Sequence, residues 1–128
     1  MEETHIREIP LENDLRVHLY DGSRRLAGDR WLVQLIARIP MPVDAVWTPQ
    51  PDDPVSGTDL KEALGEAPVF ETVKSRHFID EQEKDEIFQA MQAELVRHSL
   101  PYLGHPDFAR RFLLKQYAEK LKRSGRHA

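Results

Sequence analysis

Three arginines and a serine lie in one short connection and could form an anion-binding site. The connection, DGSRRLAGDR, covers residues 21–30 and follows an alternating apolar stretch. A hydroxyl group and forked guanidinium donors suit a phosphate or a carboxylate, and binding groups are often carried on loops held by a rigid scaffold. In a competing interpretation, Asp21 and Asp29 pair with the arginines and the two glycines serve only the turn. The candidate ligand or peptide contacts are Ser23, Arg24, Arg25 and Arg30.

The C-terminal segment is basic and offers a second chemistry, contact with nucleic acid. Residues 110–128 contain 7 Lys or Arg and one acidic residue, whereas residues 44–94 contain 13 acidic and 4 basic residues. Cations along one helix could neutralise several phosphates. The two oppositely charged segments could instead attract each other within one fold. Nucleic-acid binding is therefore the alternative hypothesis, with Arg110, Arg111, Lys115, Lys122 and Arg123 as its candidate residues.

The sequence lacks the motifs of the common catalytic and metal-binding chemistries. It contains no cysteine, which excludes disulfides, thiolate catalysis and Cys-ligated zinc. It has no G-x-S-x-G, no phosphate-binding glycine loop and no H-E-x-x-H. His77 lies near three carboxylates that could ligate a metal, but Asp80 and Glu83 are better explained as the N-cap and capping box of a helix. We expect a non-enzymatic protein without a cofactor, because an enzyme would need a cleft that brings His77 or His98 to carboxylates.

The length and composition predict one soluble domain that covers residues 1–128. The hydrophobic fraction is 40% and the charged fraction 31%, which is compatible with a folded core. The first ten residues have no apolar run typical of a signal peptide, and no apolar run approaches the ~18–20 residues of a membrane span. We therefore expect a cytoplasmic protein. Residues 1–14 are predicted to be a loosely attached arm with a short extended piece near Ile6–Ile9, and residues 124–128 a flexible basic tail.

The stretch 29–43 is predicted to be the central strand, because apolar residues alternate along it from Trp31 to Ile39. Its other face is mixed and should be only partly covered. Residues 15–20 alternate in the same way and should pair with it as an antiparallel hairpin. Residues 69–79 are rich in Val, Phe and Thr and predict a third strand.

Three helices are predicted around these strands. Thr58 and Gly65 are expected to cap a short helix over 59–64. A second helix should follow the capping box at Asp80, with an apolar stripe formed by Ile87, Phe88, Met91 and Leu95, and a third should run to about residue 123. The order β-β-(short α)-β-α-α predicts an α+β fold, a small antiparallel sheet with two C-terminal helices packed on one face.

These observations favour a small protein-interaction or anion-binding module over an enzyme. The expected partner is an unidentified protein or a small anionic ligand, and no membrane contact is predicted. A small sheet leaves edges exposed, and the last helix has a wide apolar arc. A homodimer through a sheet edge or through that helix is therefore also open.

Overall fold

The computed structural model describes residues 3–125. Its contacts divide these residues into two compact units, which we describe separately. The first unit contains residues 3–39 and 71–105, and the second contains residues 40–70 and 106–125. The single domain expected from the sequence stays a prediction.

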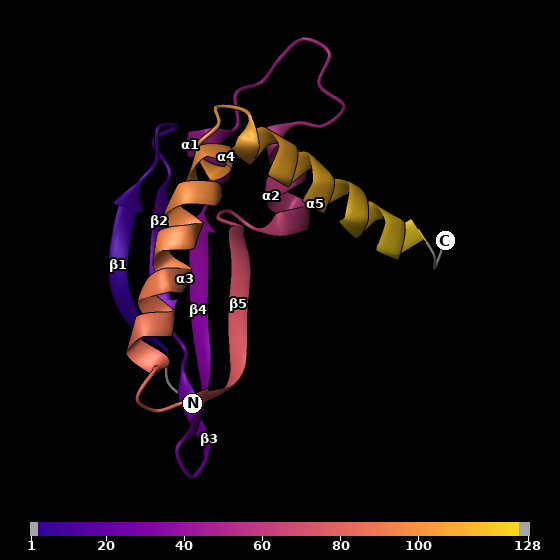
Figure 1. Cartoon of the computed structure of the whole chain (residues 1–128). Helices are drawn as coiled ribbons and strands as arrows, with labels where there is room; N and C mark the ends of the chain where they lie inside the picture. Colours follow the sequence, from indigo (N-terminus) through magenta and orange to yellow (C-terminus); the bar gives the residue numbers. More distant parts are fainter. Residues whose placement is uncertain (1–2, 126–128) are drawn as a thin grey trace. The chain divides into compact units, whose positions relative to one another are not determined.

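Five strands form an antiparallel sheet (Figure 1). They are β1 (Thr4–Pro10), β2 (Arg16–Asp21), β3 (Arg24–Ala27), β4 (Arg30–Pro40) and β5 (Val69–Asp80). Strand β1 pairs with β2, and both β2 and β3 pair with β4, each along a different part of it. Strand β5 also pairs with β4. Strands β1, β3 and β5 each pair with a single neighbour and are therefore edge strands of the sheet.

Strand β4 is central because its side chains are buried on both faces. One face carries Val33, Leu35, Ala37 and Ile39, which are almost fully buried, while Leu32 and Ile36 are buried on the other. Polar side chains interrupt this second face and are half-buried. The predicted central strand and the strand before it are confirmed, because the period of two in the apolar pattern matches the alternation of side chains in a strand.

The connection over residues 21–30, predicted to be a loop, is mostly strand. Strand β3 lies inside it, and the turn shrinks to Gly28 and Asp29, with Gly28 at a φ of 56° that suits the first position of a tight hairpin turn. The ladder continues because the Ser23 hydroxyl accepts a hydrogen bond from the Gln34 backbone N–H at 3.0 Å. Gly22 and Ser23 interrupt the strand between β2 and β3, and the Ser23 hydroxyl accepts there in place of a backbone carbonyl.

Helix α3 (Lys84–His98) covers one face of the sheet, and the short helix α4 (Leu100–Leu103) follows it (Figure 1). Phe88 and Leu95, from the predicted apolar stripe, are buried. The predicted capping box at Asp80 is wrong, because α3 begins after Glu83 and has no side-chain cap. Asp80 ends β5 instead, and its carboxylate accepts a hydrogen bond from the Gln82 backbone N–H at 2.9 Å.

Much of the predicted N-terminal arm belongs to the sheet. Residues 4–10 form β1, which pairs with β2 over its whole length apart from one register shift. In the turn that follows, Asn13 Nδ2 donates to the backbone oxygens of Leu103 and His105, both at 3.0 Å. This side chain satisfies the Leu103 carbonyl, which the short helix leaves without a helical partner, and also binds the His105 carbonyl beyond the helix. Asn13 therefore connects the β1–β2 turn to residues 103–105, the last residues of the first unit.

Replacing Asn13 by Ala is expected to lower the free energy of unfolding by about 1–3 kcal/mol. The half-buried amide makes two hydrogen bonds to carbonyls, and its loss leaves them without these donors. Urea unfolding followed by circular dichroism measures the change. Glu12→Ala is the control, because the neighbouring Glu12 side chain is exposed. Equal stability losses in the two variants would contradict the proposed role of Asn13.

The second unit contains three helices, α1 (Val43–Val46), α2 (Gly57–Leu64) and α5 (Phe108–Gly125). Its core consists of Val43, Trp47, Leu60 and Leu113. The predicted N-cap of α2 at Thr58 is wrong, because Ser56 occupies that position and forms a capping box with Asp59. Gly65 is the C-cap, as predicted, at a φ of 89° that favours glycine.

The predicted fold class, an α+β fold with an antiparallel sheet and C-terminal helices, is confirmed. Of the predicted flexible tail, residues 124 and 125 end helix α5, and residues 126–128 lie outside the described residues. Among the helices described, none is both long and apolar enough to cross a bilayer.

Candidate functional site

The hairpin arginines do not converge on one open site. Arg25 contacts the Glu81 carboxylate at 2.9 Å and lies over the Trp31 ring at 5.6 Å. Arg30 contacts the carboxylates of Asp80 at 3.4 Å and Asp29 at 3.7 Å. These contacts connect the hairpin to the turn between β5 and α3.

The other two hairpin candidates differ from each other. The Ser23 hydroxyl is used by the strand ladder, and the Ser23 backbone N–H donates to Asp21 Oδ1 at 2.8 Å. Arg24 is exposed and has no ion pair among residues 3–125. Anion binding at this connection stays a prediction, with Arg24 as its most accessible cation.

Arg110, a candidate nucleic-acid contact, is held inside the second unit. Its guanidinium pairs with the Asp53 carboxylate, donates to the Thr48 backbone oxygen at 3.3 Å, and lies 4.6 Å from the centre of the Trp47 ring. Arg110 thereby fixes the loop between α1 and α2, residues 47–56, which contains three prolines, to α5. Of the other four candidates, Arg111 approaches Asp107 at 3.8 Å, whereas Lys115, Lys122 and Arg123 are exposed.

The sheet face opposite α3 carries a charged network centred on Arg38. Its guanidinium contacts Glu71 at 2.6 Å and Glu3 at 2.9 Å, and it lies 4.8 Å from the centre of the Tyr20 ring. The hydrogen bond from Arg38 lowers the pKa of the Glu3 carboxyl group, and the two carboxylates raise the pKa of Arg38. Since Arg38 already has these three partners, we do not treat this network as a binding site.

Arg38→Met is expected to return the pKa of Glu3 upward toward 4.5, its ordinary value. The wild-type carboxylate is stabilised by the guanidinium, so it takes up its proton at a lower pH than in the unfolded chain. The Glu3–Arg38 contact therefore stabilises the folded protein at pH values above the pKa that Glu3 has in the unfolded chain. This stabilisation is lost as the pH falls through the lower pKa that Glu3 has in the folded protein. A side-chain NMR titration measures the change. An unchanged pKa would show that this ion pair does not form in solution.

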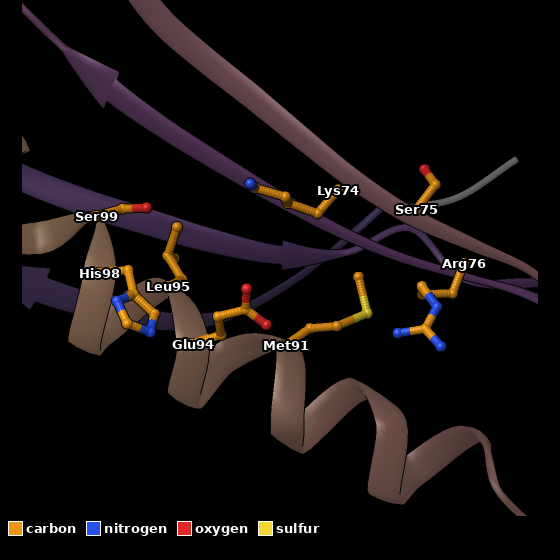
Figure 2. A pocket seen from close by; sticks show the side chains of 8 residues that line it. All are labelled: Lys74, Ser75, Arg76, Met91, Glu94, Leu95, His98 and Ser99. Carbon is orange, nitrogen blue, oxygen red and sulfur yellow. The ribbon is translucent and has the colours of Figure 1, made fainter.

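A groove between β5 and α3 is the best candidate for a binding site in the first unit. Its cavity has a volume of about 260 Å³. Figure 2 shows Arg76 extending from β5 toward α3, while Ser75 points away from the helix. The residues that line the groove are Lys74, Ser75, Arg76, Met91, Glu94, Leu95, His98 and Ser99.

The backbone next to this groove is an unpaired sheet edge. Strand β5 pairs with β4 on one side, and no backbone hydrogen bond to its other side occurs within residues 71–79 as described. The register of β5 against β4 follows from three contacts. The Met41 N–H donates to the Pro68 oxygen, so residues 41 and 68 are a hydrogen-bonded pair. The side-chain contacts Arg38–Glu71 and Gln34–Ser75 join residues that lie opposite each other in the same register. Because backbone groups alternate in direction along a strand, the N–H and C=O groups of residues 71, 73, 75 and 77 point outward.

Strand β5 is also unusually exposed for its length. It has 12 residues, and most of its side chains are exposed. Val73 is 45% exposed and Phe78 is 70% exposed. Phe78 also has a φ of 57°, a left-handed conformation that is strained for an aromatic residue. An exposed edge with unpaired backbone groups is a template for pairing with another chain.

The groove brings the His98 ring, the Glu94 carboxylate and the Ser99 hydroxyl together, which raises the question of catalysis. Nucleophilic catalysis needs a hydroxyl group within hydrogen-bond reach of its base. No hydrogen bond joins His98 to Ser75, Ser99 or Glu94 in the described part of the chain. Residues 3–125 also contain no group of three or more potential metal ligands.

Comparisons with known proteins give this site no precedent. No family model, no curated protein and no solved structure matches the chain. The sequence predicted strand β5 and the helix after it, but not the groove between them. The available signal was the alternation of Lys74 and Arg76 in a strand without proline.

Proposed function

We propose that this protein is a non-enzymatic interaction module that binds an extended polypeptide segment along the free edge of β5. The observation that carries the proposal is the unpaired edge beside a groove. An added strand gains main-chain hydrogen bonds from the edge, and pockets for alternate side chains give specificity. A cytoplasmic location, expected from the sequence, is part of the proposal.

Of the other edge strands, β3 has only 4 residues, and β1 is also a poorer template. It has 7 residues, ends in Pro10 and changes register between His5 and Arg7. Short length, proline and irregular register are features that protect sheet edges from further pairing. Strand β5 has none of these protections between residues 69 and 77. The contrast between the two edges favours β5 as the binding edge.

Amide NMR of the ¹⁵N-labelled protein with a pool of random short peptides tests the proposal. The largest shift changes are expected at the outward amides of residues 71, 73, 75 and 77, with slower exchange of these amides with solvent. The amides of β1 serve as the internal control and should stay unchanged. A pool that shifts only other regions, or none, would refute the proposal.

Phe78→Asn is expected to raise the free energy of unfolding by about 1 kcal/mol while weakening peptide binding. Asn tolerates a left-handed φ better than an aromatic residue does, and little buried area is lost because Phe78 is mostly exposed. Residues in such strained conformations cluster at binding and catalytic sites. Thermal unfolding and peptide titration are the two measurements. A destabilised variant with unchanged binding would show that Phe78 serves the fold.

Nucleic-acid binding remains the alternative function, supported by the exposed cations Lys115, Lys122 and Arg123 on α5. Contacts to phosphates would make the logarithm of affinity fall with the logarithm of salt concentration. A titration with duplex DNA and single-stranded RNA at several salt concentrations distinguishes this function. Absence of binding at low salt would end the alternative.

A further inference from the structure

Two cations on β5 face the groove and have no ion pair among residues 3–125. They are Lys74 and Arg76, which are both exposed. By contrast, Arg38 on the opposite face of the sheet contacts two carboxylates. Since Glu71 and Ser75 contact β4 side chains on that opposite face, the even residues 74 and 76 lie on the α3 side. Figure 2 shows the Arg76 guanidinium extending toward α3, whereas the Lys74 side chain runs along the strands.

The spacing of these cations sets a requirement on an added strand. Residues two apart in a strand lie on the same face, so side chains opposite Lys74 and Arg76 would also be two apart. In an antiparallel pairing these positions are the non-hydrogen-bonded ones, because their backbone groups point to β4. Cross-strand side chains are closest at such positions.

We propose that the segment bound along β5 is acidic, with two carboxylates at alternate positions that pair with Lys74 and Arg76. This inference rests on the proposed function and names the chemistry of its partner. The intervening residue of the segment lies on the other face, between the exposed Val73 and His77, where an apolar side chain covers the exposed Val73. The recognised pattern is therefore acidic–apolar–acidic in an extended conformation.

A second copy of this chain is a less suitable occupant of the edge. The residues of β5 that line the groove are Lys74, Ser75 and Arg76, and none is acidic. Antiparallel self-pairing centred on residue 74, 75 or 76 places cations opposite one another, and like charges directly opposite are destabilising. Self-pairing centred on residue 73 avoids this repulsion but still gives neither cation a carboxylate.

Glu94 on α3 lines the same groove and opposes an acidic segment. Its carboxylate forms no ion pair with Lys74 or Arg76 within 4 Å among the residues described. Removing its charge should therefore strengthen binding of the acidic segment, whereas removing the cations should weaken it. These opposite directions separate a local charge effect from a general loss of structure.

The experiment compares three short peptides of equal length by fluorescence anisotropy at low salt. One has two glutamates two residues apart in an apolar β-forming sequence, the second has them adjacent, and the third has glutamines in their place. The first should bind most tightly. The double variant Lys74→Gln/Arg76→Gln should weaken its binding about 2- to 25-fold, the value for two exposed ion pairs. Glu94→Gln should strengthen it about 1.5- to 5-fold.

The possible results separate this inference from the proposed function. Equal affinities for the three peptides, with shifts at the outward β5 amides, would overturn the acidic pattern and leave the interaction module intact. If none of the three peptides binds, both the acidic pattern and the proposed interaction module are overturned. Sedimentation that shows self-association, lost on Ser75→Pro, would replace the acidic segment by a second copy of the chain.

Discussion

Leu19→Ala is expected to lower the free energy of unfolding by about 2–5 kcal/mol. Leu19 is fully buried in β2 and lies opposite Ala37 of β4. Ala37, its partner on the central strand, is too small to extend into the space that the leucine vacates. The cavity would therefore persist, and its cost adds to the lost transfer free energy.

Urea unfolding of the full chain measures this effect. Val96→Ala is the control, because Val96 is exposed on α3 and its truncation should change stability by no more than about 0.5 kcal/mol. Leu19→Met should recover most of the loss, since it conserves volume. Similar results for Leu19→Ala and Val96→Ala would show that the α3–sheet core is not formed as described.

Two single proline substitutions in β5, Thr72→Pro and Ser75→Pro, should have opposite effects: the first should impair folding and the second should impair peptide binding. Thr72→Pro removes an N–H that points to β4 and should cost at least about 1–3 kcal/mol. Ser75→Pro removes an outward N–H, so the β4–β5 ladder stays intact and folding is retained. The same change removes a donor from the free edge, and binding of an extended peptide should be lost.

Thermal unfolding and peptide titration of both variants, with Ser75→Ala as the matched control, measure these effects. Ser75→Ala accounts for the lost hydrogen bond between Gln34 and the Ser75 hydroxyl, at 3.3 Å, and should keep peptide binding. If Ser75→Pro binds as well as Ser75→Ala, the peptide does not pair with this edge. If Ser75→Pro is the less stable of the two prolines, the inferred backbone directions are reversed.

The sequence predicted those elements in which a periodic apolar pattern is the dominant signal. Alternation identified β2 and β4, and the stripe through Phe88 and Leu95 identified α3. Helix starts were predicted less well, because several neighbouring residues have side chains suitable for capping. Ser56 and Thr58 both qualify as caps of α2, and Ser56 is the one that forms the capping box with Asp59.

The long-range pairings could not be predicted from composition or spacing. Arg110 and Asp53 are far apart in the sequence, and nothing in the basic segment singles out Arg110 from its neighbours. The proposed binding edge also depends on a long-range pairing. Which amides of β5 point outward depends on the register of β4 against β5, and that register is visible only in the folded chain.

The path of the chain also has a consequence for engineering. Arg38 and Glu71 are in contact on neighbouring antiparallel strands, so the chain leaves the first unit and returns to it at adjacent points. Antiparallel neighbours can be joined by a two-residue turn. Residues 40–69 can thus be regarded as an insertion in a β-hairpin. A shortened chain that joins Ile39 to Phe70 through Asn-Gly, so that Arg38 stays opposite Glu71, and that stops after His105 would be a minimal version of the sheet, with the Asn13 hydrogen bonds retained at its end.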